Sequence, residues 1–113
     1  METILLIAVI AAFLIWRMKP AKGVNTMTTA QLKTVLNDKD KVFVDVRTSA
    51  EYKARNVKQF KNIPLGSDFS KLPKDKEIVV ICQSGMRSKQ ACNQLKKLGY
   101  EQVTNVRGGM SAY

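Results

Sequence analysis

The stretch from residue 78 to residue 88, Ile-Val-Val-Ile-Cys-Gln-Ser-Gly-Met-Arg-Ser, places a cysteine at the junction of a strand and a helix. Its first four residues are apolar and β-branched, which predicts a strand buried on both faces of a parallel sheet. After this loop, the apolar residues Ala91, Leu95 and Leu98 have the spacing of one face of a helix, and Gly99 follows as a typical helix end. Cys82 is therefore expected at the carboxyl end of a strand, where sites of α/β sheets lie.

Other segments extend this alternation of strands and helices. Thr28 and Gln31 have the spacing of a capping box and predict the start of a helix. The largely β-branched run 42–46 predicts a second buried strand, and residues 49–52 predict a brief helix after it. Residues 103–106 predict a third strand. The fold class expected from this order is α/β, with a parallel sheet flanked by helices.

The first 18 residues have the composition of a membrane anchor. Residues 3–16 read TILLIAVIAAFLIW and carry no charge, so a helix over them is apolar on nearly all sides and not amphipathic. A helix over residues 1–18 is about 27 Å long, close to the roughly 30 Å of a bilayer core. We expect one N-terminal transmembrane helix (1–18), a linker (19–24) and one domain (25–113).

The charges around the apolar run favour an anchor over a cleaved signal peptide. A signal peptide has basic residues before its apolar run, whereas Arg17, Lys19 and Lys22 follow it here. Ala21-Lys22-Gly23 resembles a cleavage site, which keeps the signal peptide as the alternative. By the positive-inside rule, the prediction is a single-pass protein of the cell membrane, with its N-terminus outside and its domain in the cytoplasm.

The composition of the chain limits which partners and which kinds of catalysis are expected. The 113 residues suffice for one compact domain, and 19 basic against 9 acidic residues give a formal charge of +10, which favours anionic partners. The lysines are scattered without interleaved aromatic residues, so no nucleic-acid partner is predicted. The chain has no histidine and two cysteines, which excludes histidine-assisted catalysis, and neither a metal nor another cofactor is expected.

The position of Cys82 favours a reactive thiolate. Backbone N–H groups and the positive end of the helix dipole lower the pKa of a thiol at a helix N-terminus. Gly85 allows a positive φ in the loop, and Arg87 is expected to add a charge at the mouth of the site. The alternative is that Cys82 is simply a buried strand cysteine.

Four motifs in the same order resemble the single-domain rhodanese family. CQSGMRS resembles its active-site loop, Cys-x-x-Gly-x-Arg-Ser, and the others are DVRTSAEY (45–52), NIP (62–64) and GGM (108–110). The resemblance covers roughly residues 25–113 and implies a sulfurtransferase. It implies that sulfane sulfur moves from a small anionic donor such as thiosulfate, or from a protein persulfide, to a thiol or cyanide through a persulfide on Cys82. The implied substrate-binding residues are Gln83, Ser84, Gly85, Met86, Arg87 and Ser88.

The chain departs from the family pattern in two places. RNVKQFKNIP, residues 55–64, stands where the family has Gly-His-Ile and a Gly-Ala pair before its Asn-Ile-Pro. Tyr113 stands where the family carries Trp after GGM. Both changes concern the packing beside the loop and leave the loop itself intact.

Two other functions fit part of the pattern. A cysteine phosphatase or arsenate reductase resembles Cys-x5-Arg, whereas four residues separate Cys82 from Arg87, which leaves less room for a tetrahedral anion. A membrane-tethered binding module without turnover is the other alternative.

Two side chains outside the loop, Cys92 and Arg47, have weaker assignments. We expect Cys92 to fill the core, with a disulfide to Cys82 as the alternative. We expect Arg47 to pair with Glu51 one helical turn later, with a role in the site as the alternative.

Overall fold

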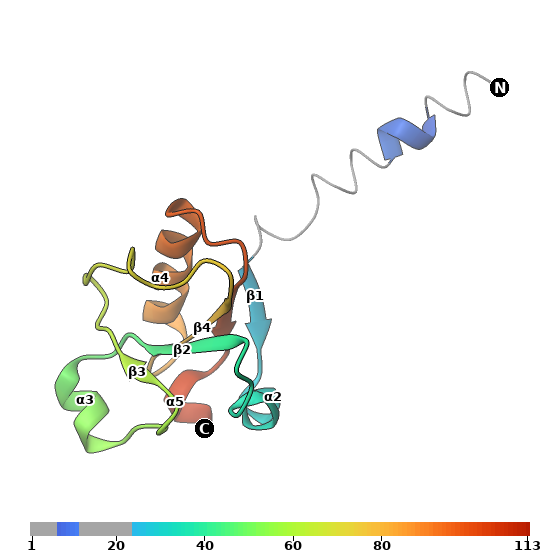
Figure 1. Cartoon of the computed structure of the whole chain (residues 1–113). Helices are drawn as coiled ribbons and strands as arrows, with labels where there is room; N and C mark the ends of the chain where they lie inside the picture. Colours follow the sequence, from blue (N-terminus) through green and yellow to red (C-terminus); the bar gives the residue numbers. More distant parts are fainter. Residues whose placement is uncertain (1–6, 12–23) are drawn as a thin grey trace.

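The centre of the protein is a parallel sheet of five strands (Figure 1). The computed structural model describes residues 7–11 and 24–113. Every strand pairing is parallel, and the strands lie in the order β1-β5-β4-β2-β3. Their bounds are β1 Val24–Met27, β2 Lys41–Asp45, β3 Lys61–Asn62, β4 Glu77–Ile81 and β5 Val103–Val106. The expected strands are β2, β4 and β5, so the α/β parallel sheet is confirmed, and β1 and β3 extend it.

Four helices accompany the sheet: α2 Thr29–Val35, α3 Ser49–Ala54, α4 Met86–Lys97 and α5 Gly109–Ala112. The predicted capping box at the start of α2 is present, because the Thr28 side chain accepts from the Gln31 amide and the Gln31 side chain accepts from the Thr28 amide. A second such box, made by Thr48 and Glu51, starts α3. These side chains satisfy amide groups that a helix start leaves without partners.

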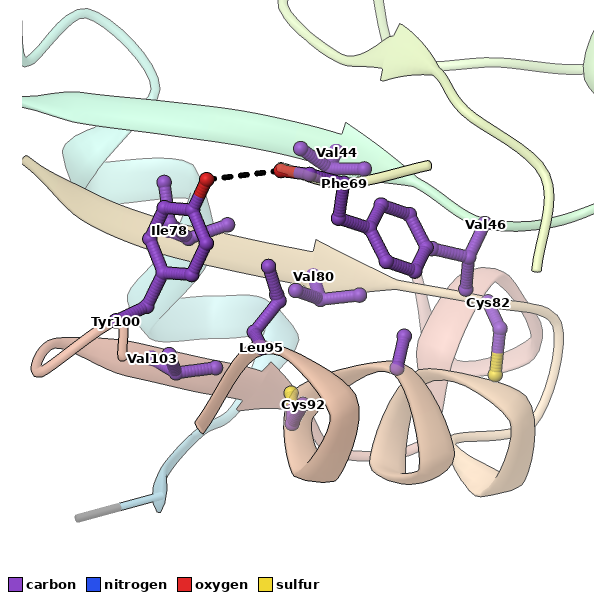
Figure 2. Close-up of a cluster of buried hydrophobic side chains, with 11 residues drawn as sticks. Val44, Val46, Phe69, Ile78, Val80, Cys82, Cys92, Leu95, Tyr100 and Val103 are labelled. Carbon is purple, nitrogen blue, oxygen red and sulfur yellow. Dashed lines mark hydrogen bonds between the residues drawn. The ribbon is translucent and has the colours of Figure 1, made fainter. Parts of the chain in front are cut away.

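Alternation of side chains along the strands creates two cores, one on each face of the sheet. The first lies between the sheet and α4 (Figure 2). It contains Val44, Val46, Phe69, Ile78, Val80, Cys82, Ala91, Cys92, Leu95, Tyr100 and Val103. The hydroxyl of buried Tyr100 donates to the carbonyl of Phe69 at 2.8 Å and lies 2.7 Å from the carbonyl of Leu72. These contacts hold the loop before β4 against this core.

The second core holds α2 and α5 against the opposite face. It contains Leu32, Phe43, Val57, Phe60, Val79, Ile81, Val106 and Met110. β4 therefore contributes Ile78 and Val80 to one core and Val79 and Ile81 to the other. Burial on both faces explains why residues 78–81 are all apolar. The strand ends at Ile81, and Cys82 begins the loop.

The expected membrane anchor falls largely outside the described residues. Of segment 1–18, only residues 7–11 are described, and they are helical. In the described ranges, 7–11 and 24–113, none of the helices has both the length and the hydropathy that crossing a bilayer requires. The linker 19–24 is described only at its last residue, Val24, which already belongs to β1.

Candidate functional site

Cys82 follows the last residue of β4 and is fully buried. Helix α5 supports the backbone at this point, since the amide of Met110 donates to the Cys82 carbonyl at 2.8 Å and the amide of Ser111 donates to the Gln83 carbonyl at 2.9 Å. The approach is close at Gly109, where a Cβ atom would lie 2.2 Å from the Cys82 carbonyl oxygen. The GGM segment thus has a physical role: a residue without a side chain lets α5 rest directly on the loop.

The loop turns so that its amide groups face the sulfur. Gly85, the residue before α4, has φ of +102°, a left-handed conformation that favours glycine. Its amide donates to Cys82 Sγ at 3.0 Å, and Ser88 Oγ lies 3.3 Å from the same sulfur. The expected positive φ at Gly85 is confirmed.

These contacts favour the charged form of the thiol. Burial raises the pKa of Cys82, but hydrogen bonds from the Ser88 hydroxyl and from the amides of Ser88, Gly85 and Ser84 outweigh it and lower the pKa overall. Hydrogen bonds to a charged form stabilise that form. The position of Cys82 before the N-terminus of α4 and these hydrogen bonds therefore both favour the thiolate form.

Arg87 does not present a free charge to this site. Its guanidinium is held by both carboxylate oxygens of Glu51, at 2.7 and 2.9 Å. The hydrogen bond from Arg87 lowers the pKa of Glu51 to about 2, and that from Glu51 raises the pKa of Arg87. The pair leaves much less net charge at the mouth than Arg87 alone, so the loop amides are the main attraction for an anion.

The expected ion pair between Arg47 and Glu51 is wrong. Buried Arg47 pairs instead with buried Asp45 at 2.8 Å, and only the backbone carbonyl of Glu51 accepts from it, at 3.3 Å. Arg47 also donates to the Arg55 carbonyl and lies 3.5 Å from Gln83 Oε1. One guanidinium therefore contacts the end of β2, helix α3 and the loop, which an ion pair with the Glu51 side chain alone would not have done.

The structure brings all six predicted loop residues around one turn, with different exposures. Ser88 is fully buried, whereas Ser84 and Met86 are exposed, Met86 by 74%. Gln83 is half-buried, and its side chain donates to Ser111 Oγ at 3.2 Å.

Asn105 of β5, which no motif of the sequence includes, also belongs to this site, because it forms hydrogen bonds with both Ser88 and Gly85. A polar residue inside the otherwise buried run 103–106 was the available signal.

Cys92 lies in the core, as expected. It is fully buried in the cluster of Figure 2, and burial raises the pKa of its thiol to about 12. A thiol with this pKa is almost entirely protonated at neutral pH and is a poor partner for thiol exchange.

Two other features of the described residues bear on the chemistry. They contain no group of three or more histidine, cysteine or acidic side chains able to hold a metal ion. A groove of about 290 Å³ lies at the far end of α4 and does not include Cys82; it is lined by Ser67, Asp68, Phe69, Gln94, Lys97 and Leu98. We place the site at Cys82 because its sulfur is the atom on which amide donors converge.

Comparison with known proteins agrees with this geometry. A sulfurtransferase of Allochromatium vinosum is 37% identical over 94 residues, which cover 80% of this chain and 88% of the relative. A tRNA uridine(34) hydroxylase of Escherichia fergusonii is 32% identical over 79% of this chain, which spans only 28% of that protein. The crystal structure of a rhodanese-like domain protein from Staphylococcus aureus has a TM-score of 0.70 at 30% identity, covering 78% of this chain and 89% of that one.

The family comparison covers nearly all of the folded domain. Residues 28–113 match the rhodanese-like domain, and the matched range includes Cys82, its loop and both helices that contact it. With the shared sheet and the sulfurtransferase relative, this match shows that the chain belongs to the rhodanese family.

Proposed function

We propose that the protein is a sulfurtransferase that carries sulfur as a persulfide on Cys82. The Cys82 thiolate attacks the outer sulfur of a donor such as thiosulfate. The new S–S bond forms as the old one breaks, and sulfite leaves with the electron pair. An acceptor nucleophile, a thiolate or cyanide, then takes the outer sulfur and returns Cys82 to the thiolate.

The observation that carries this proposal is the convergence of donors on one sulfur. The Gly85 amide at 3.0 Å, together with the amides of Ser84 and Ser88, favours the thiolate needed for attack. Once a second sulfur is attached, the negative charge moves to that outer atom. Loop amides that point into the site can stabilise it there, as an oxyanion hole stabilises a developing charge.

The pairing of Arg87 with Glu51 supports sulfur transfer over phosphate chemistry. A cysteine phosphatase needs a guanidinium free to bind phosphate oxygens, and here both carboxylate oxygens of Glu51 occupy it. A loop with four residues between Cys82 and Arg87 also suits one sulfur atom better than a tetrahedral anion. Small anionic donors and protein persulfides both fit a site whose rim is exposed at Ser84 and Met86.

The test is the mass of the domain after incubation with thiosulfate. We expect a gain of one sulfur atom that cyanide removes, because Cys82 is the one cysteine of the two with a lowered pKa. The gain should be absent in Cys82→Ser and unchanged in Cys92→Ala, the matched control. A gain that survives Cys82→Ser, or is lost only in Cys92→Ala, would show that Cys82 is not the carrier.

We further propose that segment 1–18 anchors the protein in the cell membrane, with the domain in the cytoplasm. The support is the uncharged run 3–16 and the three basic residues Arg17, Lys19 and Lys22 behind it. Protease added to intact cells should leave the domain whole, whereas permeabilised cells should lose it. Digestion in intact cells would reverse the topology, and a mature chain beginning near Gly23 would replace the anchor by a cleaved signal.

A further inference from the structure

Asn105 contacts both groups that hold the Cys82 sulfur. Its Oδ1 accepts from the Ser88 hydroxyl, and its Nδ2 donates to the Gly85 carbonyl at 3.3 Å. The amide of Gly85 donates a hydrogen bond to Cys82 Sγ, and Ser88 Oγ lies 3.3 Å from that sulfur. A half-buried side chain on β5 is therefore connected to the Cys82 sulfur by two routes, each through one intermediate residue, Ser88 or Gly85.

The direction of these hydrogen bonds follows from the Gly85 carbonyl. A carbonyl only accepts, so the NH2 group of Asn105 must face it, and the amide oxygen must face Ser88. The Ser88 hydroxyl has a single hydrogen, and in this arrangement Asn105 receives it. Toward Cys82, Ser88 then offers a lone pair, which can accept from a thiol S–H; the hydroxyl lowers the pKa of Cys82 only when its hydrogen turns toward the sulfur.

Stabilisation of the Cys82 thiolate by the Ser88 hydroxyl consequently requires that hydroxyl to turn. The hydroxyl donates to the thiolate only after its hydrogen leaves Asn105, so the two acceptors compete for one hydrogen. When Cys82 becomes a persulfide, its own sulfur is no longer charged, and the hydrogen can return to Asn105. We propose that Asn105 is a positioning residue that controls when Ser88 donates its hydrogen to the Cys82 sulfur; its role in turnover rests on the proposed function.

The charged groups around Cys82 do not involve Asn105. On the side of α4, Arg87 is paired with Glu51, and Cys92 is buried. On the side of β2, Asp45 is paired with Arg47, and α5 has no ionisable side chain. A neutral substitution at Asn105 therefore changes the hydrogen bonding of Ser88 while the local charges stay the same.

The test is a double-mutant cycle read on the ionisation of Cys82. Asn105→Ala, Ser88→Ala and the double variant are made in a Cys92→Ala background, and the rate of Cys82 alkylation by iodoacetamide is measured against pH. Asn105→Ala frees the Ser88 hydrogen for the thiolate, so the midpoint of the rate-against-pH curve should fall by about one pH unit. At a pH below the midpoint, alkylation should then be about tenfold faster. Ser88→Ala should raise the midpoint, and the double variant should match Ser88→Ala.

The cycle separates this role from simple support of the loop. If Asn105→Ala shifts the midpoint equally with and without Ser88, Asn105 acts through Gly85, and the proposal is wrong. Asn105→Asp serves as a second variant, because it keeps the shape and the acceptor. It should raise the midpoint more when Ser88 is present than in Ser88→Ala, and equal shifts would also overturn the proposal.

Alkylation does not depend on sulfur transfer, so the two proposals fail separately. Should thiosulfate add no mass to the domain, the midpoints still decide whether Asn105 governs the Ser88 hydrogen. Far-UV circular dichroism of each variant verifies that the midpoints belong to folded protein.

Discussion

Replacing Gly109 by alanine is expected to destabilise the protein by at least about 3 kcal/mol and to reduce sulfur transfer about a hundredfold or more. The new Cβ atom would lie 2.2 Å from the Cys82 carbonyl oxygen and 2.8 Å from the carbonyl carbon and oxygen of Gln83. Backbone atoms cannot move aside as a flexible side chain can, so α5 and the loop must separate. That separation breaks the hydrogen bonds from Met110 and Ser111 and shifts the nucleophile.

Gly66→Ala is the matched control for this substitution. Gly109 has a positive φ, +56°, and Gly66 has one too, +95°, but an added Cβ atom at Gly66 would have no neighbour within 4 Å. Its effect is backbone strain alone, about 1–2 kcal/mol, with sulfur transfer retained. Chemical denaturation and the rate of mass gain measure both variants. Equal losses in the two would mean that strain, and not contact with the loop, explains the requirement for glycine at residue 109.

Asp45→Asn is expected to destabilise the domain by about 3–5 kcal/mol. It leaves the guanidinium of Arg47 charged and buried, where Asp45 now accepts its Nε and Nη2 groups at 2.8–3.1 Å. Because Arg47 also holds the carbonyls of Glu51 and Arg55, α3 should loosen together with the end of β2.

An ion pair with an exposed carboxylate supplies the comparison for Asp45. Asp38 lies 3.3 Å from Lys41 with 44% of its side chain exposed, so Asp38→Asn should change the free energy of unfolding by less than about 1 kcal/mol. Urea denaturation of both variants at neutral pH gives the two values. Similar losses would show that the Asp45–Arg47 pair contributes no more than a surface pair.

The parts of the fold that could be predicted are those with a strong local pattern. β2, β4 and β5 are buried between two layers, and the apolar, mostly β-branched residues that form most of β2 and β4 made these strands recognisable. β1 lies at one edge of the sheet and reads Val-Asn-Thr-Met, and β3 has only two residues, both polar. Edge strands bury fewer side chains, so nothing in their sequence separates them from loops.

Side-chain pairing in the site could not be predicted from spacing. Arg47 and Glu51 are one helical turn apart, which favoured a pair, yet Glu51 binds Arg87, 36 residues away. Arg47 lies before the first residue of α3, and the buried carboxylate of Asp45 is nearer to it. Cys82 and Gly85 could be placed because the strand, the loop and the helix are continuous in sequence, whereas Asn105 reaches them only through the pairing of β5 with β4.

The dependence of the loop on α5 has a consequence for the newly made chain. Synthesis releases β4 and Cys82 before Gly109–Ala112, and domains fold as their parts emerge. Until α5 arrives, the carbonyls of Cys82 and Gln83 lack the amides of Met110 and Ser111 that hold them. A chain interrupted before α5 therefore carries the Cys82 thiol without its supported loop, and the loop is held only once Met110 and Ser111 have emerged and docked.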